Sequence, residues 1–171
     1  MEPDAQTVDR AKQQAYRSLA YRSQTRRELR DRLQRQGYSI EVIDNVLRDL
    51  EAAGYVDDNK VALNWARYRL QNKPMGRRRL AWELQQRGVP SASVEAVLRE
   101  VYGEVDEVSL AEQATRKRLG SSELPSSPRE RQRYVRYLFN LGFDTDIIAA
   151  ALAAVSPSMA ALDVVSDDDP C

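Results

Sequence analysis

One short pattern occurs three times in this chain of 171 residues and restricts what it can fold into. Each copy is centred on a glycine, with large apolar or aromatic residues eight and four positions before it and six and ten positions after it. The glycines, 51 and 54 residues apart, are Gly37, Gly88 and Gly142. A spacing of four places side chains on one face of a helix, and glycine is typical of the position just after a helix ends. The pattern therefore predicts three helix–glycine–helix repeats in an all-α protein.

A further helical segment precedes each repeat, so we expect three tandem modules of three helices each. The predicted boundaries are residues 11–54, 55–103 and 104–155. Residues 1–10 lack a periodic apolar pattern, and residues 156–171 end in an acidic run. Both segments are predicted to be disordered tails.

Polar residues mark where several helices should begin. Thr25 with Glu28, and Ser127 with Glu130, have the spacing of a capping box, the second with proline at the first helical position. Ser39 is predicted to cap a third helix. Asp57-Asp58 is the tightest acidic pair outside the tail, and a helix N-terminus explains it better than catalysis does.

The charges are segregated although the net charge is zero. Residues 22–36, 67–87 and 116–136 carry net charges of +4, +6 and +5. Acids gather between these segments, with six in residues 41–58 and five in residues 95–107. Each module is therefore predicted to have a basic middle helix followed by an acidic third helix.

The composition argues against an enzyme. The chain has no histidine, and its one cysteine, Cys171, is the last residue. The commonest general base and a cysteine metal cluster are therefore both missing, and no phosphate-binding glycine motif follows a strand pattern. We expect no cofactor and no metal. Nor is there an apolar run long enough for a membrane span or an export signal, so we expect a cytoplasmic protein without a membrane partner.

The basic segments have two interpretations. Arginine is a good helix former, so these faces could simply be solvated. Alternatively, the repeated basic helices form a binding surface for phosphates or for an acidic protein groove, which the preference for arginine over lysine favours. The candidate partner-binding residues are Arg26, Arg27, Arg30, Arg67, Arg69, Lys73, Arg77, Arg78, Arg79, Arg87, Arg116, Lys117, Arg118, Arg129, Arg131, Arg133 and Arg136. Residues 67–87 are the predicted principal contact region.

The aromatic residues beside the richest arginine segment also have two interpretations. Trp65, Tyr68 and Trp82 could be stacking platforms for single-stranded bases, or they could be packing residues at helical spacing. Tyr38, Val89 and Phe143 directly follow the repeat glycines and are predicted to make the hydrophobic contact of a helix cap.

Several of these motifs together resemble the RecX family, bacterial regulators of the RecA recombinase. The most specific is Gly-Tyr-Val-Asp-Asp at residues 54–58, followed by Trp65-Ala66-Arg67. The resemblance spans residues 11–152 and also rests on Thr25-Arg26-Arg27-Glu28-Leu29, Gly37-Tyr38, Gly76-Arg77-Arg78-Arg79-Leu80, Arg87-Gly88-Val89 and Gly142-Phe143. The third module departs from the family pattern, because Asn140-Leu141 stand where basic residues are common.

This resemblance implies three three-helix modules in an elongated, curved array. It also implies a non-catalytic protein that binds RecA and its filament on single-stranded DNA and limits filament extension, ATP hydrolysis and strand exchange. We expect the protein to be a monomer. Weak direct DNA binding could accompany this activity. One alternative is a small helical DNA-binding protein that acts on nucleic acid by itself. Another is a helical-repeat scaffold for an unrelated protein, without any nucleic acid.

Overall fold

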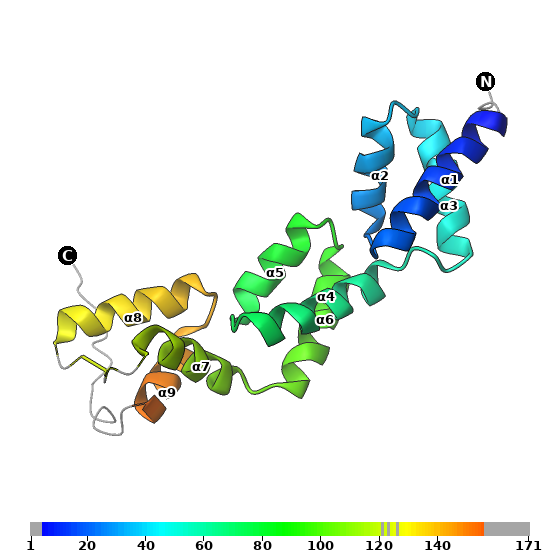
Figure 1. Cartoon of the computed structure of the whole chain (residues 1–171). Helices are drawn as coiled ribbons and strands as arrows, with labels where there is room; N and C mark the ends of the chain where they lie inside the picture. The colour runs from blue at the N-terminus through cyan, green and yellow to red at the C-terminus, as the bar shows by residue number, and fades with distance from the viewer. Residues whose placement is uncertain (1–4, 121, 123, 126, 156–171) are drawn as a thin grey trace, which may run out of the picture. The chain divides into compact units, whose positions relative to one another are not determined.

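The computed structural model describes residues 5–120, 122, 124–125 and 127–155. Over these residues the chain forms α-helices and no strands (Figure 1). The helices are α1 (Ala5–Tyr21), α2 (Arg26–Arg35), α3 (Ile40–Ala52), α4 (Asp58–Asn72), α5 (Arg77–Gln86), α6 (Ser91–Glu104), α7 (Glu107–Leu119), α8 (Pro128–Asn140) and α9 (Thr145–Val155). The predicted all-α fold of three-helix modules is confirmed.

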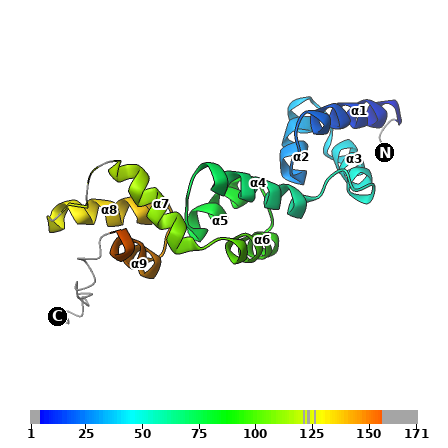
Figure 2. The same cartoon turned by 60° about the horizontal axis from the view of Figure 1, so that its bottom comes forward.

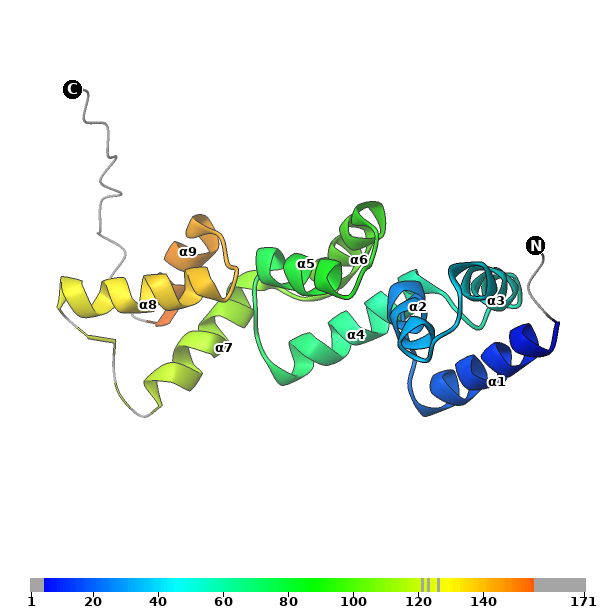
Figure 3. The ribbon, with the colours of Figure 1, turned by 90° about the horizontal axis from the view of Figure 1, so that it is seen from above.

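The chain divides into two compact units. Unit 1 takes in Met1–Asn72 and Leu80–Glu104, and unit 2 takes in Lys73–Arg79 and Val105–Cys171. In unit 1, α1, α2 and α3 pack on one another and α4 packs on α6 (Figures 1 and 2). In unit 2, α7 packs along α9 and both contact α8 (Figure 3).

The apolar positions of the repeat form the core. Leu29, Leu33, Ile43 and Leu47 are at most 1% exposed, and Leu80, Leu84 and Val94 of the second module are buried as well. Two repeat positions depart from this and are half-buried: Leu98 of the second module, and Tyr134, which stands where the other modules have leucine.

All three repeat glycines end a helix in the left-handed region, with φ of +87°, +80° and +88° for Gly37, Gly88 and Gly142. After α2, the amide of Tyr38 donates to the carbonyl of Leu33 at 3.3 Å, and Gly37 donates to Gln34 at 3.0 Å. These two bonds define a Schellman motif, and equivalent pairs close α5 and α8. The predicted hydrophobic caps follow: Val89 and Phe143 are buried and Tyr38 is half-buried.

The predicted N-terminal caps of the helices are confirmed in part. Thr25 and Glu28 form the predicted capping box, and Ser39 accepts a hydrogen bond from the amide of Val42 at 3.4 Å. Ser127 precedes α8 with proline at the first position, but its side chain makes no capping hydrogen bond, so the capping box predicted there is wrong.

The N-terminal boundary also needs correction. Helix α1 begins at Ala5, so the described part of the predicted disordered tail, residues 5–10, is helical. The predicted C-terminal tail lies outside the described residues. No described helix is long and apolar enough to cross a membrane.

Candidate interface: module joints and arginine surface

Within unit 1, the first turn of α2 docks on the last turn of α5. The buried Thr25 hydroxyl donates to the carbonyl of Arg87 at 2.8 Å while accepting a hydrogen bond from the amide of Glu28. The Arg26 amide donates to a carboxylate oxygen of Asp58, at the start of α4, at 2.6 Å. An ion pair of 2.9 Å between Arg87 and Glu28 joins the same two helix ends. We call this set of contacts joint 1.

Within unit 2, the first turn of α5 docks in the same way on the last turn of α8. The amide of Gly76 donates to the carbonyl of Leu141 at 2.9 Å, and the amide of Arg78 donates to Gly142 at 3.3 Å. The amide of Arg77 donates to Glu107, at the start of α7, at 3.0 Å. We call this set joint 2.

The two joints use equivalent positions of the repeat. In each joint, the residue before the repeat glycine supplies the carbonyl that accepts a hydrogen bond. An acidic residue at the start of the first helix of the following module, α4 or α7, accepts a second hydrogen bond from the first amide of α2 or α5. A helix N-terminus thus donates to a helix C-terminus, which satisfies groups that both ends would otherwise leave unpaired. The joint is therefore a repeated structural element that the sequence pattern alone did not predict.

Glycine is required at the joints because two segments of the same chain approach each other closely there. A Cβ on Gly88 would overlap the side chain of Arg27, and a Cβ on Gly142 would overlap Arg79. A Cβ on Gly76 would meet main-chain atoms of Gly142 and Phe143. A larger residue at any of these positions must push the joint apart.

The carboxyl group of Asp58 in joint 1 has a raised pKa. Burial raises the pKa of its carboxyl, the hydrogen bond from the Arg26 amide opposes this shift, and the nearby charge of Glu51 adds to it. Of the acidic pair that the sequence assigned to a helix N-terminus, Asp57 caps α4 through the amide of Lys60 at 3.0 Å, while Asp58 serves the joint.

Many of the candidate arginines already have acidic partners in the chain. Arg67 contacts Glu100 at 3.0 Å and Glu104, and this hydrogen bond lowers the pKa of the Glu104 carboxyl. The other pairs are Arg26 with Glu51, Arg30 with Asp44, Arg69 with Glu83, Arg77 with Glu107, Arg78 with Asp144, Arg87 with Glu28 and Arg116 with Glu112. Acids of α3 and α6 thus neutralise arginines of α2 and α4, which explains part of the charge segregation.

The three candidate stacking residues differ in exposure. Trp65 is half-buried, with the guanidinium groups of Arg87 and Arg69 5.0 and 6.0 Å from its ring centre. Tyr68 and Trp82 are 65% and 51% exposed. Only the last two rings present enough surface for a base to stack on.

A second group of candidate cations is exposed and forms no ion pair among the described residues: Arg27, Lys73, Lys117, Arg118, Arg129, Arg133 and Arg136. The remaining two candidates, Arg79 and Arg131, have partners within the chain.

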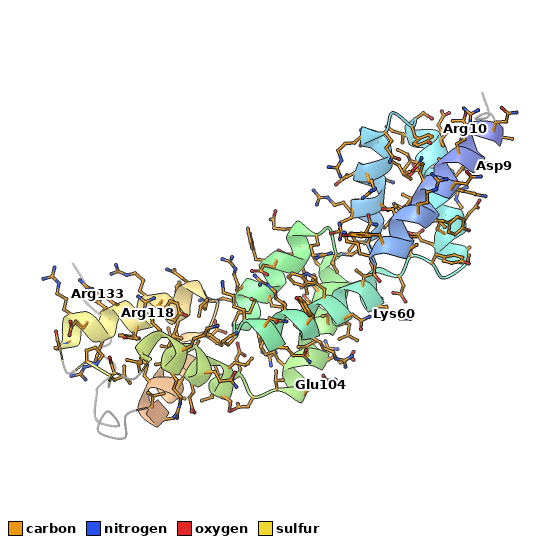
Figure 4. The ribbon with its side chains drawn as sticks, viewed as in Figure 1. Asp9, Arg10, Lys60, Glu104, Arg118 and Arg133 are labelled. Atoms are coloured by element: carbon orange, nitrogen blue, oxygen red, sulfur yellow. The ribbon has the colours of Figure 1, made fainter. Side chains whose placement is uncertain are left out.

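Most of this second group lies on α7 and α8. Arg129, Arg133 and Arg136 are spaced along one face of α8, because intervals of four and three residues correspond to about one helical turn each. Arg118, at the end of α7, lies over the rings of Tyr137 and Tyr134 at 4.3 and 5.6 Å; Figure 4 labels it together with Arg133. We call Lys117, Arg118, Arg129, Arg133 and Arg136 the α7–α8 cationic surface.

No described group of three histidine, cysteine or acidic residues could hold a metal ion.

Comparison with known proteins agrees with this architecture. Family models for the first, second and third three-helix domains of RecX match residues 11–50, 57–98 and 104–152. The regulatory protein RecX of Pelodictyon phaeoclathratiforme is 34% identical over 158 residues, which cover 92% of each chain. That of Halorhodospira halophila is 36% identical over 140 residues, covering 82% of this chain and 84% of the relative.

The fold is shared with solved structures as well. The crystal structure of RecX from Lactobacillus salivarius superposes with a TM-score of 0.77 at 18% identity, covering 89% of this chain and 98% of that one. Three matching domain models in the order of the modules, together with relatives above 30% identity over most of their length, lead to one conclusion: the chain belongs to the RecX family of regulatory proteins.

Proposed function

We propose that this protein is a non-catalytic inhibitor of a RecA recombinase. It binds RecA and the RecA filament on single-stranded DNA, and it limits filament extension, ATP hydrolysis and strand exchange. Family membership supports the connection with RecA, and the exposed cations support a binding role. The protein acts as a monomer in the cytoplasm.

The observation that carries the binding site is the α7–α8 cationic surface. An arginine that already has a carboxylate partner must give up that contact before it can bind another acid or a phosphate. An exposed guanidinium group without one can form charge-assisted, bidentate hydrogen bonds at no such cost. We therefore place the main contact with the filament on α8, and give the ion-paired arginines of residues 67–87 a supporting role.

The test is RecA ATP hydrolysis on single-stranded DNA, titrated with a variant in which Arg129, Arg133 and Arg136 are replaced by Gln. These residues are exposed, so the variant should keep the helicity of the parent protein while inhibition weakens strongly. A control replaces Arg10, Arg17 and Arg99 by Gln, which removes the same charge from exposed positions of unit 1 outside the last turn of α2. Equal inhibition by the two variants would contradict the assignment of the site.

Direct DNA binding is the second candidate, supported by the exposed rings of Tyr68 and Trp82 near basic residues. It predicts that labelled single-stranded DNA binds without any recombinase and that affinity falls steeply with salt, with a log–log slope of about −0.7 for each phosphate contacted. Binding to the filament would instead be favoured if the protein inhibits ATP hydrolysis at concentrations well below that of its binding sites on DNA, and if this inhibition persists at moderate salt.

A further inference from the structure

The last turn of α2 is a third copy of the surface that accepts a helix end in joints 1 and 2. Gly37 has the same left-handed conformation as Gly88 and Gly142, and the same Schellman bonds close the helix. Its surroundings differ, however. The space next to Gly37 contains no atom within 4 Å of where a Cβ would stand, whereas Arg27 and Arg79 fill that space at the other two glycines.

In the described part of the third module, the amide equivalent to the donors of joints 1 and 2 is already bonded. In the register of the repeat, Arg131 of α8 corresponds to Arg26 and Arg77, whose amides donate across the joints. Helix α8 begins three residues earlier in this register, so the amide of Arg131 is already bonded to the carbonyl of Ser127 at 3.0 Å. A second copy of this chain therefore cannot repeat the joint in the same register, because the equivalent amide is already bonded within α8.

We infer that the exposed turn at Gly37 is a docking site for the N-terminal turn of a helix in the partner protein. The two occupied joints define the chemistry of this helix end. It brings a free amide or a hydroxyl group to the carbonyl of Gln36, and an arginine or lysine in its first turn lies across Gly37. The partial negative charge of the α2 C-terminus favours such a donor.

The contact at Gly37 is expected to be weaker than the joints within the chain. Thr7 stands four residues before Ala11, as Asp58 and Glu107 stand four before Ala62 and Ala111, so the accepting carboxylate of the joints is missing here. A contact without that carboxylate suits a partner that is bound and released. This inference rests on the proposed function, since it takes the partner to be the recombinase filament.

Two glycine replacements test the inference. Asparagine tolerates the left-handed conformation better than most residues do, so Gly37→Asn keeps the turn but places a side chain where the partner helix should dock. Gly54→Asn is the matched control, because Gly54 ends α3 with φ of +74° and also has no atom within 4 Å of a Cβ. Binding is measured as the affinity of each labelled variant for preassembled RecA filaments on single-stranded DNA.

We expect Gly37→Asn to weaken binding roughly tenfold or more, and Gly54→Asn to bind as the parent protein does. Equal affinities of the two variants would overturn the inference and leave the proposed function intact. Failure of the parent protein itself to bind any filament would instead overturn the proposed function. Self-association of the parent protein in analytical ultracentrifugation that Gly37→Asn abolishes would assign the turn to a second copy and also overturn the inference.

Discussion

Replacing Gly76 by Ala tests the joint most directly. Gly76 is buried at the start of α5, and its φ is not positive, so alanine brings no left-handed strain. The new methyl group would overlap the main chain of Gly142 and Phe143, which no side-chain rotation can relieve. Two hydrogen bonds cross this contact, from Gly76 to Leu141 and from Arg78 to Gly142. At about 1 kcal/mol for each of the two bonds, and with overpacking costs of about 1–3 kcal/mol, we expect a loss of roughly 3–5 kcal/mol.

The assay is thermal unfolding followed by far-UV circular dichroism. A loss of about 3 kcal/mol lowers the Tm by roughly 6–12 °C for a chain of this size. Hydrogen exchange locates the effect, because the amide of Arg78 should lose protection. The control is Gly103→Ala in α6, where no atom lies within 4 Å of the new methyl group. Alanine is the better helix former by up to about 1 kcal/mol, so this variant should be as stable as the parent or more stable. A Gly76→Ala protein with unchanged Tm would refute the steric reasoning.

Three further changes test the helix ends and joint 1. Thr25→Ala should lower the free energy of unfolding by about 1–3 kcal/mol, because it leaves buried hydrogen-bonding groups unpaired, whereas Thr25→Ser should lose much less in the same denaturant titration; equal losses would show that the hydroxyl contributes nothing. Ser39→Ala should lose about 1 kcal/mol and Ser127→Ala almost nothing, since only Ser39 caps its helix; the reverse order in thermal melts would argue against these caps. The raised pKa of Asp58 means that the folded state binds the proton more tightly than the unfolded state, so its contribution to stability is present below the ordinary aspartate pKa and is lost as pH rises through the folded value. The free energy of unfolding of the parent protein, compared with that of Asp58→Asn, should therefore decrease as pH rises from the acidic range towards neutrality. If the difference between the two free energies stays constant with pH, this linkage is excluded.

The local pattern of the sequence was enough to predict the helix pairs. The glycine with its four flanking apolar positions identified the Schellman turns and most of the core, because both depend on residues close in sequence. Tyr134 shows where the pattern loses force, since a tyrosine at a core position keeps its ring partly exposed under the guanidinium group of Arg118. Ser127 had the right spacing for a capping box, but spacing alone does not fix the direction of the hydroxyl group.

The candidate site was less predictable. Composition identified which segments are basic, but it could not show that Arg67 has two acidic partners on α6 while Arg133 on α8 has no ion pair among the described residues. These contacts join residues far apart in sequence. The joints were missed for the same reason, although one signal was present. Asp58 and Glu107 occupy equivalent positions at the starts of α4 and α7, and an alignment of the modules extended to their first helices would have found them.

The atoms that form the joints have a consequence for how such a chain can change over time. In joint 2, two of the crossing bonds have main-chain atoms at both ends, and the third has a main-chain donor. Changes to most side chains therefore leave the two main-chain bonds in place, provided that the glycines stay. The outward faces of α2, α5 and α8 can exchange charges and aromatic rings at little structural cost. A protein built in this way can adapt its surface to a changing partner while the attachment of one helix end to the next stays the same.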